Sequence, residues 1–257
     1  MTDPDPSPAG PITLSLDIGG TGLKAGLLDQ AGQMVGTRAR VETPHPSSPE
    51  SIVPALVGLA HCLGAFDRVS VGFPGVVHGT TILTAPNLGT ETWAGYDLGG
   101  VLAERLGRPV RMHNDATVQG LGVIAGKGVE CVITLGTGFG FALYYNGRLA
   151  PHLEMSQHIV RGKTTYDEYL GVAARNMVGK KRWRRRAQKM LVQLRAVVNW
   201  DTLYIGGGNA RIIDFALPAD IHIVSNDAGI TGGVRLWDPK LDDDFALTGV
   251  VSPPGQS

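Results

Sequence analysis

The sequence predicts an α/β protein built from two similar halves. Short apolar segments typical of strands alternate with segments whose apolar residues recur at helical spacing. A strand–turn–strand unit with a turn rich in Gly and Thr occurs twice, at residues 12–28 and again at 130–150. We interpret this recurrence as a duplication of architecture and not of sequence.

The first half starts with three predicted strands that form an antiparallel meander, because Gly and Asp turns separate them. These strands are expected at 12–19, 23–29 and 33–43. The next expected elements are a helix at 51–64, a strand at 68–75, a helix at 98–107, a strand at 109–115 and a helix at 116–126.

In the second half, the strand pair of residues 130–150 is followed by a helix whose apolar residues include Leu191, Leu194 and Val198. The elements expected there are a helix at 182–200, strands at 201–210 and 221–226, and a last helix at 228–237. We therefore expect residues 1–11 to be a disordered arm, 12–115 an N-terminal lobe, 116–227 a C-terminal lobe, and 228–257 a helix that returns to the N-terminal lobe and ends in a loose tail.

The composition excludes several classes of protein. Lys plus Arg and Asp plus Glu both number 23, so the overall charge does not favour nucleic acid or an acidic membrane as a partner. The N-terminal residues do not resemble a signal peptide, and no apolar run approaches the about 20 residues of a membrane span. We expect a soluble, cytoplasmic protein.

A glycine-rich turn follows the first predicted strand, in DIGGTGLK at 17–24. Its glycines, Gly19, Gly20 and Gly22, expose backbone N–H groups that bind phosphate oxygens, and the Thr21 hydroxyl adds a donor. Asp17 is placed to hold a hydrated magnesium ion beside the phosphates. The alternative is a plain hairpin turn.

Two further turns have a similar character. TLGTGFG at 134–140 suits a phosphate through Gly136, Thr137 and Gly138, and we expect it to face the first turn across a cleft and bind the same polyanion. YIGGGNA at 204–210 lacks side chains at its three glycines, where a flat ring can approach. A nucleotide base and ribose are therefore expected at Gly206, Gly207 and Gly208; a strand-to-helix turn is the alternative.

The segment HNDA at 113–116 lies where a strand ends and a helix begins, a common place for active sites in open α/β sheets. Asp115 is our candidate for the catalytic base that accepts the proton of an attacking hydroxyl, and Asn114 for a group that orients this hydroxyl. The alternative is that Asn114 or Asp115 is a helix N-cap.

In this order and spacing, the motifs resemble those of the ROK family (repressors, uncharacterised frames and sugar kinases), from residue 12 to about 237. The resemblance implies the actin-like, hexokinase-like ATPase fold, with two lobes around a cleft. VGFPGVV at 71–77 also resembles a family segment. Gly22 paired with Lys24 looks like the polyphosphate-dependent glucokinase branch, so Lys24 joins the expected phosphate-binding residues.

The resemblance also implies the sugar-binding residues. Asn87 and Asn114 resemble two sugar ligands, and Glu154 resembles the glutamate of the family's E-x-G-H signature. Here the sequence departs from that signature, because Ser156 replaces the glycine and Gln157 the histidine, with His158 one residue later. Either Gln157 or His158 can bond a sugar hydroxyl. A further family glutamate corresponds to Glu168, with Asp167 as the alternative.

The implied function is phosphoryl transfer from ATP or polyphosphate to a hexose, with magnesium and in a homodimer. The family's cysteine-rich segment is absent, so no structural zinc is expected. The alternatives are a kinase for another hexose or an N-acetyl amino sugar, and a non-catalytic sugar sensor. Family repressors carry a DNA-binding module before the first phosphate strand, and the 11 residues before Ile12 are too few for it, so no nucleic-acid partner is expected.

A basic run, GKKRWRRRAQK at 179–189, has seven Lys and Arg residues interrupted by Trp183. One interpretation is a docking strip for polyphosphate, an extended polyanion that needs several cations. The other is a solvated helix face.

Overall fold

The computed structural model describes residues 10–225 and 228–248. The chain divides into two compact units, unit 1 with residues 1–113 and 230–257, and unit 2 with Asn114–Gly229. Asp115 therefore lies in unit 2, near its first residue. The expected disordered arm and the end of the expected tail fall mostly on residues 1–9 and 249–257, which lie outside the described residues.

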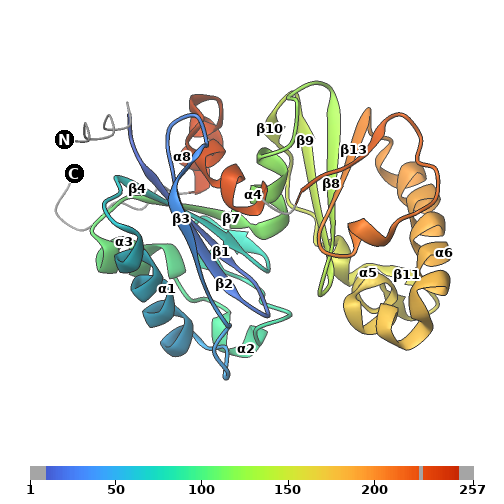
Figure 1. Ribbon diagram of the computed structural model, residues 1–257, viewed down its shortest axis with the longest axis horizontal. Helices are drawn as coiled ribbons and strands as arrows, with labels where there is room; N and C mark the ends of the chain where they lie inside the picture. The colour runs from blue at the N-terminus through green and yellow to red at the C-terminus, as the bar shows by residue number, and fades with distance from the viewer. Residues whose placement is uncertain (1–9, 226–227, 249–257) are drawn as a thin grey trace, which may run out of the picture. The chain divides into compact units, whose positions relative to one another are not determined.

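Unit 1 contains a five-stranded sheet in the order β3-β2-β1-β4-β7. β2 pairs antiparallel with β1 and β3, as the meander predicted, whereas β4 runs parallel to β1. α1 contacts β2 and β3 and also packs against α3 (Figure 1). The strands are β1 (Thr13–Ile18), β2 (Leu23–Leu28), β3 (Met34–Val41), β4 (Arg68–Phe73), β5 (Val77–His78), β6 (Thr81–Ile82) and β7 (Val110–Asn114), and the helices before β7 are α1 (Pro49–Leu63), α2 (Thr90–Trp93) and α3 (Leu98–Leu106).

The C-terminal segment returns to this sheet. The Ser15 hydroxyl donates to the Ile230 carbonyl at 2.8 Å, and the Ser70 hydroxyl to the Gly233 carbonyl at 2.7 Å. The elements of this segment are α7 (Ala228–Thr231), the 3-10 helices η3 (Gly232–Trp237) and η4 (Pro239–Leu241), and α8 (Asp242–Thr248). We expected a loose tail from Asp238 onwards, and this prediction is wrong for residues 239–248. They form η4 and α8, in which Leu241 and Phe245 are buried.

Unit 2 repeats the strand pattern of unit 1, with a sheet in the order β10-β9-β8-β13-β14. β9 is antiparallel to β8 and β13 is parallel to it, the same arrangement as β2 and β4 around β1. The duplication of architecture is therefore confirmed. The strands are β8 (Val129–Leu135), β9 (Phe139–Tyr145), β10 (Arg148–Leu149), β11 (Ile159–Arg161), β12 (Thr164–Thr165), β13 (Thr202–Gly206) and β14 (Ile221–Ile223).

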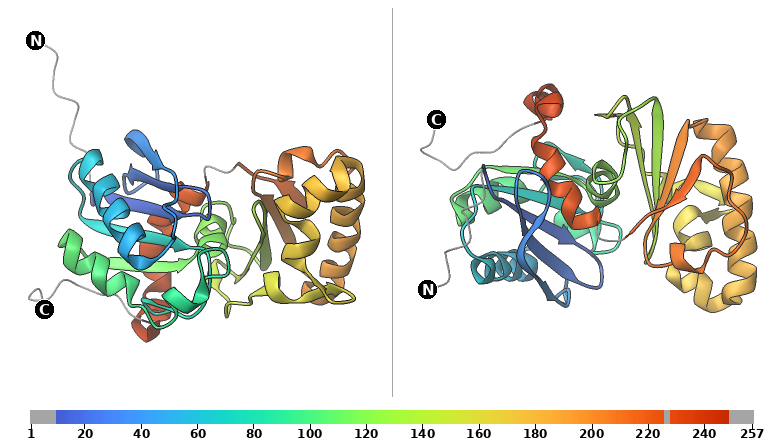
Figure 2. Two further views of the ribbon diagram at one scale, coloured as in Figure 1. Left: turned by 90° about the horizontal axis from the view of Figure 1, so that it is seen from below. Right: turned by 45° about the horizontal axis from the view of Figure 1, so that its top comes forward.

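The long helix of unit 2 packs through one apolar face. Trp183, Met190 and Leu194 are buried together with Cys131 of β8 and Leu203 of β13. The backbone of α6 also contacts α5 (Figure 2). The helices are α4 (Asp115–Leu121), η1 (Met155–Gln157), α5 (Tyr166–Leu170), α6 (Val172–Val198) and η2 (Ala210–Ile212). Within the described part of the chain, no helix has the length and apolarity that crossing a membrane requires.

We predict that Gly233→Ala destabilises unit 1. The added Cβ would clash with Ser15 Oγ and lie 3.2 Å from the Ser70 Cβ, both on central strands. Overpacking of this kind costs about 1–3 kcal/mol, which urea unfolding measures. Gly58→Ala is the control, because nothing lies within 4 Å of its added Cβ on the exposed face of α1. The prediction fails if both variants unfold at the wild-type urea concentration.

Candidate functional site

The first glycine turn of unit 1 is closed by its own backbone. The Gly19 amide donates to the Gly22 carbonyl at 3.1 Å, and the Thr43 hydroxyl donates to the Gly19 carbonyl at 2.5 Å. Thr21 is exposed at the tip. Asn87 lies beside the turn, since a Cβ added to Gly20 would be 3.5 Å from the Asn87 Cβ. The structure thus brings together two segments that the sequence assigned to phosphate and to sugar.

Three charged side chains stand in a row across the strands that flank this turn. Asp17, Lys24 and Arg40 occupy paired positions on β1, β2 and β3. The Lys24 Nζ lies 2.7 Å from the Asp17 Oδ2, so Lys24 is committed to an ion pair. A Cβ added to Gly22 would lie 2.9 Å from the Arg40 Nε, which places this guanidinium at the turn. Sequence reasoning missed Arg40, because only the strand register reveals its neighbours.

In unit 2, the start of α4 separates the roles of two adjacent residues. Asn114 is the N-cap, and its Oδ1 accepts hydrogen bonds from the amides of Ala116 and Thr117 at 3.0 and 3.3 Å. The Asp115 Oδ1 also accepts from the Ala116 amide, at 2.8 Å. Asn114 is buried, whereas Asp115 is partly exposed. The capping alternative therefore holds for Asn114, and α4 does not require Asp115 as its cap.

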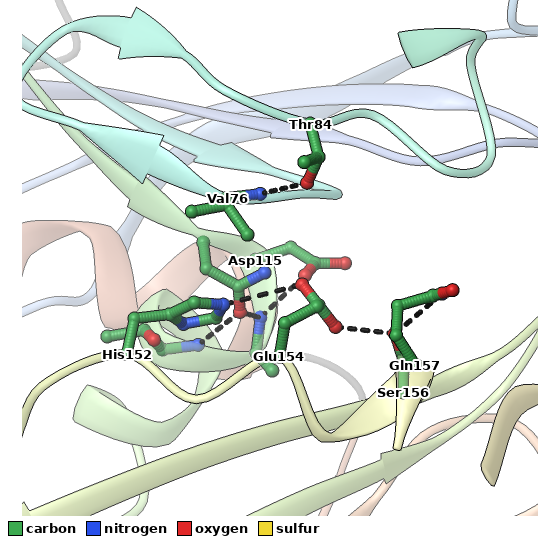
Figure 3. A network of polar contacts seen from close by, with 10 residues as sticks. Val76, Thr84, Asp115, His152, Glu154, Ser156 and Gln157 are labelled. Carbon is green, nitrogen blue, oxygen red and sulfur yellow. Dashed lines mark hydrogen bonds and ion pairs between the residues drawn. The ribbon is translucent and has the colours of Figure 1, made fainter. Parts of the chain in front are cut away.

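A polar network surrounds Glu154. Its Oε1 accepts a hydrogen bond from the Ser156 hydroxyl at 2.5 Å, and its Oε2 lies 3.4 Å from the His152 Nε2. The Gln157 amide donates to the Ser156 Oγ at 3.1 Å. Figure 3 draws Asp115 in this same group of polar side chains. His152 and Ser156 are candidate site residues that sequence reasoning did not propose, although their spacing of two residues on either side of Glu154 was visible.

The structure separates the two candidates for the family histidine. Gln157 joins the Glu154 network through Ser156. His158, by contrast, lies against the Tyr166 ring, with 6.2 Å between the ring centroids. Gln157 is therefore the better placed of the two to act together with Glu154.

The network determines the charge of Glu154. Burial acts to raise the pKa of this carboxyl, but hydrogen bonds from His152 and Ser156, together with the charge of His152, outweigh burial and lower the pKa below its ordinary value. Glu154 is consequently an ionised hydrogen-bond acceptor near neutral pH. A carboxylate of this kind binds hydroxyl groups strongly.

The second glycine turn is supported by the segment that joins α5 to α6. The Gly136 amide donates to the Gly138 carbonyl at 3.0 Å, and the Val172 amide donates to the carbonyls of Gly136 and Thr137, each at 3.1 Å. Thr137 is exposed at the tip of the turn. A Cβ at Gly171 would lie 2.6 Å from the Thr137 carbonyl oxygen, so this junction requires glycine.

Asp167 and Glu168 have different roles. The Asp167 Oδ1 accepts from the Phe139 amide at 2.6 Å, directly after the second turn. Burial and the charges of Glu154 and Glu168 raise its pKa, against the lowering effect of the Phe139 amide. Glu168 forms a capping box with Thr165 at the start of α5. The alternative residue, Asp167, is thus the one in contact with the predicted phosphate site.

The three glycines after β13 differ in their surroundings. A side chain at Gly206 would collide with Gln119, and one at Gly207, whose φ is +87°, with the Leu135 backbone. Gly208 instead borders an open pocket of about 500 Å³, which we call the Gly208 pocket. Its other lining residues are Arg175, Asn176, Gly179, Lys180, Arg211 and Ile212.

Asn209 connects this pocket to the second turn. Its Oδ1 accepts from the Arg175 Nη1 at 2.5 Å, and its Nδ2 donates to the Gly136 carbonyl at 3.3 Å. Asn209 is only 2% exposed. The pocket wall and the second glycine turn are therefore parts of one hydrogen-bonded assembly.

We predict that the stabilising effect of the Glu154 charge is lost in acid. The pKa of Glu154 is lower in the folded state than the ordinary value of 4.5. The carboxylate therefore stabilises the fold above pH 4.5, and this stabilisation disappears as the pH falls through the pKa of the folded state. Wild type and Glu154→Gln should therefore differ in melting temperature at about pH 7 and converge towards about pH 3. Melting curves across this range test it, and a difference that persists unchanged in acid would contradict it.

Comparison with known proteins agrees with these motifs. Residues 13–153 match the ROK family. The polyphosphate glucokinase of Mycobacterium tuberculosis (strain CDC 1551 / Oshkosh) is 30% identical over 234 residues, which cover 84% of this chain and 88% of the relative. This coverage extends over both units.

Solved structures show the same fold. The polyphosphate/ATP-glucomannokinase of Arthrobacter sp. strain KM has a TM-score of 0.80 at 29% identity and covers 93% of this chain and 100% of its own. A ROK family glucokinase from Streptomyces griseus, in complex with glucose and AMPPNP, has a TM-score of 0.74 at 21% identity, with 88% and 98% covered. The expected actin-like ATPase fold is thus confirmed, and the chain belongs to the ROK family.

Proposed function

We propose that this protein is a sugar kinase that transfers a phosphoryl group from ATP or polyphosphate to a hydroxyl of glucose, with Asp115 as the general base. The observation that carries this proposal is the group of polar side chains in Figure 3, where Asp115 accompanies the ionised Glu154. The names of the relatives support the substrate class, since they are a polyphosphate glucokinase and a polyphosphate/ATP-glucomannokinase.

The acceptor chemistry follows from the two carboxylates. Glu154 accepts hydrogen bonds from sugar hydroxyls, with Ser156 and His152 holding its orientation. Asp115 accepts the proton of the attacking hydroxyl as the oxygen–phosphorus bond forms and the bond to the leaving phosphate breaks. Such transfers need little from the protein beyond positioning and charge stabilisation. We assign further sugar contacts to Asn87 and Gln157, and to Asn114 through its amide.

The donor chemistry uses the glycine turns. Gly136, Thr137 and Gly138 bind donor phosphates through their backbone and hydroxyl groups, and Gly19–Gly22 of unit 1 has the same role. Arg40 adds positive charge at that turn, and Lys24, which is paired with Asp17, donates to the phosphates with its remaining N–H groups. The Gly208 pocket takes the base and ribose of ATP, because Gly208 leaves its wall open.

Magnesium suits the residues of the first turn. The Oδ2 of Asp17 forms the ion pair with Lys24. A single carboxylate is enough for a magnesium ion, because this ion retains most of its waters and also binds phosphate oxygens. Magnesium would neutralise charge on the donor phosphates. In the described ranges, no cluster of three or more His, Cys, Asp or Glu side chains is arranged to hold a metal.

A second candidate function is a kinase of broader hexose specificity. The residues Ser156 and Gln157 stand where the family signature has glycine and histidine, and one relative is named a glucomannokinase. We also propose a cytoplasmic location and a homodimer. Size-exclusion chromatography with light scattering tests the homodimer. A coupled assay of glucose, mannose and N-acetylglucosamine with ATP and with polyphosphate identifies the substrates. Absence of product from every pair would refute the kinase.

We predict that Asp115→Asn lowers kcat for glucose phosphorylation by about 10²–10⁴-fold and leaves glucose affinity nearly unchanged. The amide retains an oxygen for the Ala116 amide, so α4 keeps its start. Steady-state kinetics and a glucose titration separate the two effects. Asp201→Asn is the matched control, because the Asp201 carboxylate also accepts a backbone amide, from Val129, at an exposed position. A near-normal rate in Asp115→Asn would refute the assignment.

We predict that Gly208→Val raises KM for ATP by about tenfold or more, equivalent to about 1.4 kcal/mol, and leaves KM for polyphosphate unchanged. Nothing lies within 4 Å of the added Cβ, so the side chain enters the open pocket without a clash. Gly58→Val on α1 is the control, at another glycine with open space. An equal change for both donors would mean that the Gly208 pocket does not distinguish a nucleotide.

A further inference from the structure

A second pocket of unit 2, of about 400 Å³, is lined almost entirely by cations. They are Arg161 of β11 and five residues of α6, which are Lys181, Arg182, Arg185, Arg186 and Lys189. We call this the basic pocket. The sequence alone allowed a solvated helix face here, but the structure gathers these side chains around a hollow.

The charges of the basic pocket are not neutralised by carboxylates. Among the described residues, Lys181, Arg182, Arg185, Lys189 and Arg161 form no ion pair. Other arginines of the same helix do have acidic partners: Arg184 pairs with Asp214, and Arg195 with Asp220. The 27 residues of α6 include no Asp or Glu. The excess charge is therefore concentrated on the side of α6 that faces the pocket.

The spacing of these cations is unfavourable for the helix by itself. Lys181 and Arg185 are four residues apart, as are Arg182 and Arg186, and Arg185 and Lys189. Like charges at this spacing destabilise a helix. A bound polyanion would place negative charge between these cations and reduce their mutual repulsion. Binding would therefore stabilise this part of the helix.

Buried anchors fix the orientation of this face. The Trp183 indole is fully buried, and its Nε1 donates to the Leu170 carbonyl at 2.8 Å. Arg186 Nη1 donates to the Tyr169 carbonyl at 3.1 Å, and its guanidinium lies 4.6 Å from the centroid of the Tyr169 ring. Since these contacts hold α6 against α5, Lys181, Arg182 and Arg185 remain exposed at the pocket.

The basic pocket is connected to the donor side of unit 2. α6 begins with Val172, whose amide donates to the Gly136–Gly138 turn, and a kink at Gly179 (φ 77°, ψ 157°) precedes the cations of α6 that line the pocket. Lys181 follows Val172 by nine residues along the chain. Lys180 lines the Gly208 pocket and the adjacent Lys181 lines the basic pocket. A path of positive charge therefore leads away from the proposed phosphate site.

We propose that the basic pocket binds the distal part of a polyphosphate chain whose reacting end lies at the Gly136–Gly138 turn. The proposal rests on the proposed function for the identity of the donor. ATP and tripolyphosphate carry only three phosphates and end near the turn, so they do not engage the pocket. A longer chain does, because it presents one charge after another along its length.

A single-stranded nucleic acid is the competing polyanion, and the pocket lacks what such a ligand requires. Single strands are bound by stacking bases on exposed aromatic rings. Tyr169 is the aromatic residue of the lining, and it is only 7% exposed, with Arg186 over its ring. The basic pocket thus offers charge without a stacking surface.

The test is a triple variant, Lys181→Gln, Arg182→Gln and Arg185→Gln. Glutamine is a good helix former and these side chains are exposed, so folding is retained. The control triple variant, Arg105→Gln, Lys127→Gln and Lys240→Gln, removes the same charge from exposed positions elsewhere. Both are compared with wild type by fluorescence titration with labelled long-chain polyphosphate, and by glucose phosphorylation with polyphosphate, tripolyphosphate and ATP.

We expect the pocket variant to bind long-chain polyphosphate at least about tenfold more weakly, with a salt dependence reduced by about two to three counterions. KM rises for the long chain and stays unchanged for tripolyphosphate and ATP, and the control behaves as wild type. Equal affinity of the two triple variants, or tight competition by an RNA oligonucleotide of equal charge, would overturn the proposal. If wild type phosphorylates no sugar, the proposed function fails, and the titration still decides the pocket.

Discussion

The backbone junction between the second glycine turn and the start of α6 is the constraint on which the proposed donor site of unit 2 depends. Val172 donates its amide to the turn, and Gly171 brings the two backbones so close that no side chain fits between them. Asp167 completes the support by accepting the Phe139 amide. These contacts fix the first segment of α6 at the turn, and the kink at Gly179 then sets the direction of the segment that carries the cations.

The carboxyls of unit 2 differ in charge because their surroundings differ. Hydrogen bonds lower the pKa of Glu154, while burial raises that of Asp167. The surroundings thus shift the pKa values of these two carboxyls in opposite directions. The shift favours the ionised form of Glu154 and the protonated form of Asp167. Asn114 caps α4 through the amides of Ala116 and Thr117, and Asp115 follows it as the first residue of the helix.

Positive charge is used in two different ways along α6. Arg184 and Arg195 pair with carboxylates and bind carbonyls, so they support packing against the loops near β14. The cations of the basic pocket have no such compensation within the described chain. These cations repel one another, because no carboxylate of the described residues lies between them. A ligand that supplies negative charge would relieve this repulsion.

The sequence by itself determined the order of the main strands of both sheets, the repeated architecture and the positions of the glycine turns, because hydrophobic periodicity and glycine are local signals. It did not predict α5, the short strands β5, β6, β11 and β12, or the start of α6 at Val172. Its motifs also made Asp115 and Glu154 candidates for the site, and Figure 3 draws both in one group of polar side chains. Only the tertiary structure decided that Arg40 lies at the first turn, that Gln157 and not His158 joins Glu154, and that Asp167 contacts the second turn. These outcomes depend on strand register and on contacts between segments far apart in the chain, and a single sequence carries no record of either. For the same reason, the sequence did not predict the helices after Asp238. Leu241 and Phe245 are buried only because they pack against the rest of unit 1.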